Sequence, residues 1–335
     1  MARECMRLAL LVIIHLGLTY GSRRANLLMS HSDMVVNPLA PAPAPSGLCE
    51  LVVTPHGYPC KEYRVTTGDG YILGLHNIPR GRLQKGNEEG KRQPVLLQHG
   101  LLLAYWAWSW DELVEYELPA IVGFVHTQTG QKMHYVGHSL GTLVALTSFS
   151  QGMLVDMLKS AALLCPVAYL SHMTSPFGQV VAKAFIEEIM SSLLGIPEFN
   201  LKEQIVADIL IELCKQTGFN CYDLFTSITV IRNGVLTKFD YGNPAMNMLH
   251  YAHFNPHVYN LSHIPNDLPL FLSYGGQDAL SVVPDVQLLL DSLKFHDVDN
   301  LSIQFVEDFA HADFVMGVTA KSVVYNAIIA FFNHH

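Results

Sequence analysis

The sequence predicts an α/β fold built on a mostly parallel sheet. Short apolar, strand-like runs alternate with helix-like runs, and no internal repeat is present. A Gly-x-Ser-x-Gly pentapeptide, Gly137–Gly141, lies between a strand-like run and a helix-like run. The chain has 335 residues, of which 50% are hydrophobic, so it is long enough to bury one large core. We therefore expect a single α/β domain over residues 48–335.

Residues 1–47 are expected to lie outside this domain. Arg3 and Arg7 precede an apolar run, Leu8 to Leu18. That run is too short to span a bilayer but has the layout of a secretory signal peptide. An N-terminal core helix is the alternative, but basic residues precede the run and nothing caps it. We predict a signal peptide over residues 1–25, a Pro-rich extended linker over residues 26–47, and entry into the secretory pathway, towards the cell exterior or a vacuolar or lysosomal compartment.

If the chain is exported, its cysteines can form disulfides, because these bonds persist in oxidising compartments. Cys49 and Cys60 form one short-range pair, and Cys214 and Cys221 form another, each flanking Gly-containing sequence. Both pairs are candidate disulfides. Cys165 lies in an apolar run and is expected to be a buried free thiol.

Composition and spacing also limit the partners. Asn260 and Asn300 begin glycosylation sequons, which matter only in an exported chain. The formal net charge is −9 and no block of Lys or Arg is present, so nucleic acid is not an expected partner. The cysteines do not have metal-site spacing. No cofactor is expected.

The first half of the domain contains the signals of a hairpin, two strands and two helices. Tyr63–Thr67 and Tyr71–Asn77 alternate around Gly68-Asp69-Gly70 and predict a β-hairpin. Pro94–Gln98 is typical of a buried parallel strand, and it ends in a turn at His99-Gly100. Residues 109–127 are predicted to be helical, followed by the strand Met133–Val136 and a helix after Ser139.

The second half begins with a strand at Ser160–Cys165 and then changes character. From residue 171 to about 249, amphipathic helix-like runs dominate, and we interpret them as a cap inserted before the last strands. They could instead complete the outer layer of an ordinary α/β sandwich. Strand and helix signals then return in the order Leu268–Tyr274, Val286–Leu293, Leu301–Val306 and Thr319–Phe332.

Ser139 is the leading candidate for a nucleophile. In the strand–turn–helix context, Gly137 and Gly141 leave room for a crowded backbone, and His138 and Ser139 occupy the turn, so the serine hydroxyl stands exposed at the helix start. The competing interpretation is a Gly/Ser turn that only caps a buried helix.

A serine needs a base and a carboxylate that orients the base. Asp278 follows the strand at 268–274, and His311 follows the strand at 301–306, so both are expected at the carboxyl edge of the sheet, where chemistry gathers in such folds. For the oxyanion, backbone N–H groups of Leu140 and Leu101 are the expected donors. The rival carboxylates are Asp285, explained as a helix cap, Asp308 and Asp313. Among the rival histidines, His296 is expected at the surface.

These motifs together resemble a known family. The stretches that carry the resemblance are His99–Leu102, Gly137–Gly141, Gly275–Asp278, Ala310–Phe314, the opening segment with Cys60, Glu62 and Asp69–Tyr71, and Leu236–Gly242. They look like the acid lipases: gastric and lysosomal acid lipases and the plant triacylglycerol lipases, the plant branch most of all. The resemblance covers essentially all of the chain after residue 46. It implies an α/β-hydrolase with a helical cap, no metal, and Ser139, Asp278 and His311 as a catalytic triad.

The chain departs from that family in two places. Between Leu103 and Ala104 the family carries several dozen further residues, including a helix and a strand, and a second shortfall lies between Thr229 and Val230. The missing strand flanks the oxyanion strand on the side away from the elbow strand. Its loss is expected to open a gap in the sheet and to leave unpaired backbone edges.

The resemblance implies a serine hydrolase of long-chain acyl esters, triacylglycerols above all, acting on lipid at an interface. Two other functions stay open at this point. A catalytically impaired or non-catalytic, shortened family member that binds lipid is one, supported by the gap after Leu103. A sterol or short-chain carboxylesterase is the other.

Overall fold

The computed structural model describes residues 47–83, 92–100, 110–172, 236–239 and 244–335. Their centre is a five-stranded sheet in which every pairing is parallel and the strand order is β3-β4-β5-β6-β7. The strands are β3 (Val95–Gln98), β4 (Met133–His138), β5 (Leu158–Leu164), β6 (Leu270–Gly275) and β7 (Leu301–Val306). The predicted parallel α/β fold is confirmed.

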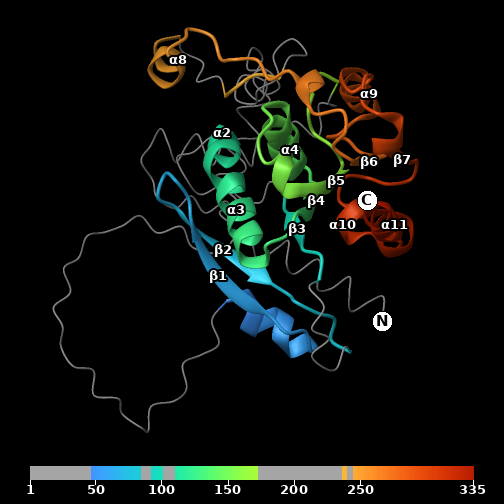
Figure 1. Cartoon of the computed structure of the whole chain (residues 1–335). Coiled ribbons are helices and arrows are strands. Elements are labelled where there is room, and N and C mark those ends of the chain that lie inside the picture. Colours follow the sequence, from blue (N-terminus) through green and yellow to red (C-terminus); the bar gives the residue numbers. More distant parts are fainter. Residues whose placement is uncertain (1–46, 84–91, 101–109, 173–235, 240–243) are drawn as a thin grey trace, which may run out of the picture.

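Helices cover both faces of this sheet (Figure 1). On one face lie α3 (Leu118–Thr129), α4 (Leu140–Ser150) and α9 (Val283–Ser292). On the other lie α10 (Asp313–Met316), η8 (Lys321–Tyr325) and α11 (Asn326–His334). In β5, Ala161 and Leu163 pack on the first face, and Ala162 and Leu164 pack on the second. Because both faces are covered, this strand is apolar at successive positions rather than at alternate ones.

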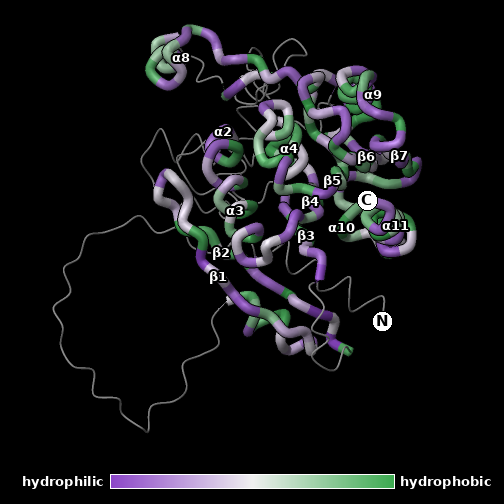
Figure 2. Tube along the Cα trace, viewed as in Figure 1, coloured by the Kyte–Doolittle hydropathy of each residue, from purple (hydrophilic) through white to green (hydrophobic). Residues whose placement is uncertain are grey.

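Helices α4 and α11, on opposite faces of the sheet, differ in how much of each is buried. Every residue of α4 after Leu140 is buried. Helix α11 buries only Ile328 and Phe331, and its hydrophilic residues lie at its two ends (Figure 2). A central helix that is buried on all sides places its N-terminus, and therefore Ser139, deep in the molecule.

The hairpin forms a separate sheet. Strands β1 (Lys61–Thr66) and β2 (Ile72–Asn77) pair antiparallel with each other and, within the described residues, with no strand of the main sheet. The hairpin packs on α3 through the rings of Tyr63 and Phe124, whose centroids are 5.3 Å apart. Strand β3 is therefore at the edge of the described sheet, as the loss of a strand beside it predicts.

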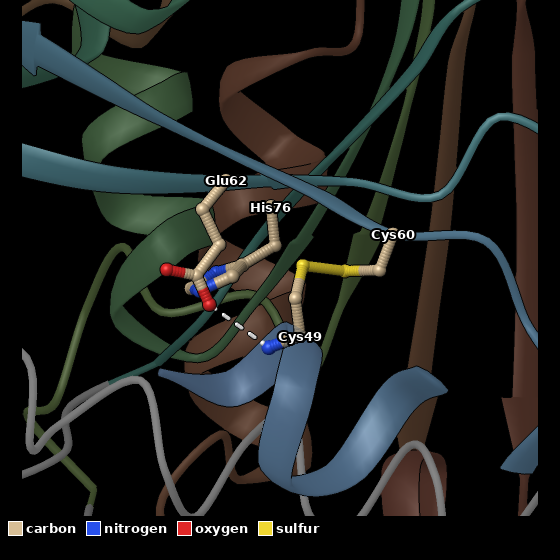
Figure 3. Close-up of a disulfide and its surroundings, with 4 residues drawn as sticks. All are labelled: Cys49, Cys60, Glu62 and His76. Atoms are coloured by element: carbon tan, nitrogen blue, oxygen red, sulfur yellow. Dashed lines mark hydrogen bonds and ion pairs between the residues drawn. A yellow bond between two sulfur atoms is a disulfide. The ribbon is translucent and has the colours of Figure 1, made fainter. Parts of the chain in front are cut away.

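A disulfide fastens the start of the domain to the hairpin (Figure 3). Cys49, in the short helix η2 (Cys49–Val53), is bonded to Cys60, which precedes β1. The backbone N–H of Cys49 also donates a hydrogen bond of 2.9 Å to Oε1 of Glu62, and His76 lies beside the same carboxylate (Figure 3). The predicted Cys49–Cys60 pair is confirmed, and so is the buried free thiol of Cys165.

Several predictions fall on residues outside the described ranges. They are the signal peptide over residues 1–25, the linker up to residue 46, the pair Cys214 and Cys221, the oxyanion donor Leu101, and most of the cap over 171–249. The described part of the cap region includes the start of helix α8 (Pro244–Tyr251). No described helix is long and apolar enough to cross a membrane.

The two sequons lie at the surface of the second half. Asn260 is exposed, and its side chain accepts a hydrogen bond from the backbone N–H of Ser262. Asn300 is partly buried at the end of the short helix η7 (Val298–Asn300). Their glycosylation stays a prediction.

Candidate active site

Ser139 occupies the sharp turn between β4 and α4. Its φ is 56° and its ψ is −121°, a backbone conformation that is costly for a residue with a side chain. Neighbouring groups hold it there: its N–H donates to the carbonyl of Leu164, at 3.1 Å, and its own carbonyl accepts from the N–H and Oγ1 of Thr142, at 2.8 and 2.6 Å. Strand β4 continues two residues beyond the predicted end, through His138, so the whole reversal falls on Ser139. This is the geometry of a nucleophile elbow.

Three glycines make that turn sterically feasible. A Cβ on Gly137 would lie 2.8 Å from the carbonyl oxygen of Gly141, and a Cβ on Gly141 would lie 2.8 Å from the carbonyl oxygens of Gln98 and His99. A Cβ on Gly100 would lie 2.8 Å from the Cβ of Ser139. The elbow is therefore packed directly against the end of strand β3, and side chains at these positions would push the two apart.

Asp278 and His311 form a hydrogen-bonded pair at the ends of β6 and β7. His311 Nδ1 donates to Asp278 Oδ2 at 2.8 Å. The other carboxylate oxygen, Oδ1, accepts from the backbone N–H groups of Leu280 and Ser281, both at 2.8 Å. Burial alone would raise the pKa of Asp278, but the hydrogen bond and charge of His311, together with the two backbone donors, outweigh it and hold this pKa below its ordinary value. The carboxylate is thus ionised and fixed in orientation.

The second nitrogen of His311, Nε2, is the atom that a catalytic base would use. His311 Nε2 is buried and has no hydrogen-bond partner among the described residues. Its ring lies beside the elbow, because the centroids of the His311 and His138 rings are 4.8 Å apart. A buried imidazole nitrogen without a partner is unusual, and here it lies next to the residue that precedes Ser139. The structure therefore pairs the predicted Asp278 and His311 and places the His311 ring beside His138, the residue before Ser139.

Sequence comparison assigns this arrangement to a family. A family model described as a partial alpha/beta-hydrolase lipase region matches residues 49–110. The chain is 42% identical over 369 residues to Triacylglycerol lipase 2 of Arabidopsis thaliana, with 86% of this chain and 88% of the relative covered. It is 30% identical over 366 residues to Gastric triacylglycerol lipase of Rattus norvegicus, with 83% and 90% covered. The chain belongs to the acid lipase family of α/β-hydrolases.

The alignment with the Arabidopsis relative also bears on the predicted gap. The aligned stretch of 369 residues is longer than this whole chain of 335 residues, so this acid lipase lacks segments that the relative carries. In the described structure, strand β3 has a partner only on the side of β4. Both observations agree with the loss of a strand next to β3.

In this acid lipase the end of β3 is bonded to a neighbouring helix. Glu117, in η4 (Leu113–Glu117), accepts a hydrogen bond of 2.9 Å from Nε2 of Gln98. Burial raises the pKa of Glu117, while the charge of His99 and the Gln98 hydrogen bond act in the opposite direction. Leu140, the first predicted oxyanion donor, is the first residue of α4. The sequence did not indicate a role for Glu117 or for Thr142. The partner of Glu117 is Gln98, 19 residues away in the sequence, and the partner of Thr142 is Ser139 in the elbow.

The rival side chains have other partners. Asp285 accepts hydrogen bonds from the backbone N–H of His172, at 3.0 Å, and from its Nδ1, at 2.8 Å. Its predicted capping role is wrong, because Val282 is the N-cap of α9 and no side-chain cap bond is made there. Asp313 accepts from the N–H of Ala310, at the start of α10. His296 is 7% exposed and bonded to the carbonyl of Leu268, so its predicted surface location is also wrong.

Among the described residues, one cluster has metal-ligating side chains close together. Ligand atoms of His138, Cys165 and His311 lie within 4.8 Å of one another. Nε2 of His138 and Sγ of Cys165 both donate to the carbonyl oxygen of His311, at 3.0 and 3.4 Å. Burial and the nearby charge of Asp278 raise the pKa of the Cys165 thiol well above its usual range, and a protonated thiol is a poor metal ligand. We interpret this cluster as a hydrogen-bond network.

Proposed function

We propose that this chain is a serine ester hydrolase that cleaves long-chain acyl esters, with triacylglycerols as the leading substrates. The observation that carries the proposal is the Asp278–His311 pair, with the free Nε2 of His311 beside a strained Ser139 elbow. The names of the relatives, triacylglycerol lipases from a plant and a mammal, support the substrate class. The lipid ester would be met at an interface, as its low solubility in water requires.

The proposed reaction uses each side chain in one role. Ser139 Oγ attacks the acyl carbon while Nε2 of His311 takes its proton, and Asp278 holds the opposite N–H and stabilises the imidazolium. The backbone N–H groups of Leu140 and Leu101 stabilise the oxyanion of the tetrahedral intermediate. The intermediate collapses as His311 returns the proton to the leaving alcohol. Water, deprotonated by His311, then attacks the acyl-serine and releases the fatty acid.

We also propose that the protein acts after entry into the secretory pathway. The Cys49–Cys60 disulfide supports this destination, because such bonds persist in oxidising compartments. The signal-like residues 1–25 supply the route.

The first experiment is covalent labelling of purified protein with a fluorophosphonate probe. We expect the probe to modify Ser139, with peptide mass spectrometry locating the adduct, and a long-chain triacylglycerol to be hydrolysed. Ser139→Ala is expected to lose both signals and to retain the wild-type circular dichroism spectrum. A cooperatively folded wild-type protein that neither labels nor hydrolyses esters contradicts the proposal.

A second candidate is a shortened family member that binds lipid without cleaving it. The separation of the β1–β2 sheet from the main sheet favours it, since an acid lipase that lacks one strand has lost support on one side of its oxyanion strand. Equilibrium unfolding and binding of a hydrophobic dye discriminate the two functions: a non-cooperative transition and dye binding in native buffer favour the impaired protein. Comparing triacylglycerol, sterol and short-chain esters separates a lipase from the remaining esterase alternatives.

A further inference from the structure

The carbonyl group of His311 is held by two elements of the main sheet. His311 lies on the turn after β7, 173 residues from His138 at the end of β4. The Nε2–H of His138 donates to the His311 carbonyl at 3.0 Å, and the Sγ–H of Cys165, just after β5, donates at 3.4 Å. Since a thiol is a weak donor, His138 makes the stronger of the two contacts.

The hydrogen bond to Asp278 does not by itself determine where Nε2 of His311 points. It fixes Nδ1, so the ring can still turn about that contact and its turn can still shift along the sheet edge. The contact from His138 reaches the main chain of His311 instead. His138 is the residue directly before Ser139, so this hydrogen bond joins the main chain of the base to the side chain of the nucleophile's neighbour.

The His138 ring also fills the space between two parts of the site. One side of the ring lies against the His311 ring, with centroids 4.8 Å apart and planes at 51°. On another side, Nδ1 of His138 is 3.4 Å from where a Cβ on Gly100 would be, in the segment that leads to Leu101. The ring therefore lies against the ring of the base and close to Gly100, two residues after the end of β3.

The hydrogen bond requires a proton on Nε2 of His138, because a carbonyl only accepts. Burial, assisted by repulsion from His311, lowers the pKa of His138 to about 4. The charge of Asp278 and the hydrogen bond to the carbonyl act in the opposite direction and do not offset the burial. His138 is thus uncharged well above pH 4, and as a weaker base than an ordinary histidine it does not compete for the proton of Ser139.

We propose that His138 is a positioning residue: by donating a hydrogen bond to the main-chain carbonyl of His311, it sets the distance between the base and Ser139. The inference rests on the proposed function, since it names how that same site is kept aligned. Reactive groups that are displaced by about 1 Å can lose about 100-fold in rate, so a single such contact matters.

The test uses two amides that differ by one methylene. In His138→Gln, the amide nitrogen is as many bonds from Cβ as Nε2 of histidine, so it can reach the His311 carbonyl. In His138→Asn, the same group is one bond shorter and cannot. We expect His138→Asn to lower kcat on a triacylglycerol and the rate of fluorophosphonate labelling by about 10- to 100-fold, with KM changed by less than about twofold. We expect His138→Gln to recover most of that loss.

Two further results decide the inference. Equal kcat for the Asn and Gln variants, both folded by circular dichroism, overturns it, whereas an inactive, unlabelled wild-type protein overturns the proposed function instead. Nitrogen-15 NMR of histidine-labelled protein supplies a readout that needs no activity: we expect His138 to stay in the Nε2–H form between pH 5 and pH 8. A neutral His138 that carries its proton on Nδ1 instead also overturns the inference.

Discussion

Ser139 is held in a conformation that few residues with side chains adopt, and the surrounding residues determine whether it can stay there. A strained backbone of this kind costs about 1–3 kcal/mol and persists only where neighbouring contacts fix it. Here the contacts come from Thr142 and Leu164, and the space comes from glycines. The elbow therefore depends on small residues as much as on the serine itself.

A pair of glycine substitutions tests this dependence. Gly141→Ala introduces a Cβ that meets the carbonyl oxygens of Gln98 and His99 at 2.8 Å, so strand β3 and the elbow must separate. We expect the variant to lose at least about 1 kcal/mol of stability, as overpacked sites do, and most of its fluorophosphonate labelling. Chemical denaturation and labelling rates measure the two effects.

The matched control is Gly123→Ala in the middle of helix α3. A Cβ at that position meets no atom within 4 Å, and alanine is the better helix former. We expect it to gain about 0.5–1 kcal/mol and to keep the wild-type labelling rate. A Gly141→Ala protein that labels as fast as the Gly123→Ala protein contradicts this account of the elbow.

At the scale of residues, the sequence predicted the members of the candidate site but not the hydrogen-bond partners of other buried side chains. Ser139, Asp278 and His311 each follow a recognisable strand, and the parallel sheet brings strand ends to one edge, so their meeting could be foreseen. Asp285 and His296 were misassigned because their partners, His172 and Leu268, come from distant parts of the chain. Local sequence around a helix start gives no signal of a partner 113 residues away.

At the scale of elements, strand β3 is the exposed end of the main sheet. Leu97 is 66% exposed and Val95 is 47% exposed, while Leu96 between them is 5% exposed. The strand thus has one apolar face in the core and one apolar face turned outward. A parallel strand that is covered on both sides has both faces buried. An exposed apolar edge strand promotes pairing with other chains.

Replacing Leu97 by lysine is therefore expected to reduce self-association. A charge on an edge strand disfavours strand pairing, and at this exposed position it buries no charge in the core. We expect Leu97→Lys to lower light scattering at high protein concentration and binding of a hydrophobic dye, with a change in stability within about 0.5 kcal/mol. Leu96→Lys, one residue away and buried, is the control and is expected to unfold the protein. Unchanged scattering in a folded Leu97→Lys protein contradicts this role of β3.

Element identities were more predictable than their arrangement. The strand Leu301–Val306 was predicted with its observed bounds, and the helix expected over 109–127 is present as a continuous run from Trp110 to Thr129. Periodicity and turn residues are local signals, so they reveal such elements. The hairpin forms a sheet of its own among the described residues. Local signals do not indicate this, and only the resemblance to the family predicted a gap in the main sheet.

At the scale of the whole molecule, the buried titratable groups make stability depend on pH. His134, on β4, is 3% exposed, bonded to Oγ of Ser160 at 2.7 Å and stacked on Phe332 of α11. Burial, with smaller contributions from Lys159 and His335, lowers the pKa of His134 to about 4. His138 has its pKa lowered to about 4 as well, so two histidines with lowered pKa values lie on β4, between β3 and β5 of the main sheet.

These shifts predict that the protein loses stability on acidification below about pH 6.5. An ordinary histidine, as in the unfolded chain, has a pKa of about 6.5, whereas the folded pKa of His134 is about 4. Between these values the unfolded state binds a proton that the folded state does not, so the free energy of unfolding falls as the pH falls. The loss is at most about 1.4 kcal/mol per pH unit for each histidine, and it ends once both states are protonated.

Asp278 adds to this loss at still lower pH. Its folded pKa lies below the ordinary value, so its contribution is fully present above the unfolded pKa and disappears as the pH falls through the folded one. Acidification therefore lowers the free energy of unfolding through Asp278 as it does through the two histidines, although folded Asp278 is charged and the folded histidines are neutral.

Denaturant unfolding at a series of pH values measures the effect, and His134→Gln isolates one part of it. Glutamine does not titrate and retains a side-chain amide that can bond to Ser160, so we expect a shallower fall in the free energy of unfolding between pH 6.5 and pH 4. The residual slope in that interval is expected to come mainly from His138, and His138→Gln should remove most of it when combined with His134→Gln. A double variant whose stability still falls as steeply as that of the wild type would show that other groups control the acid sensitivity of the fold.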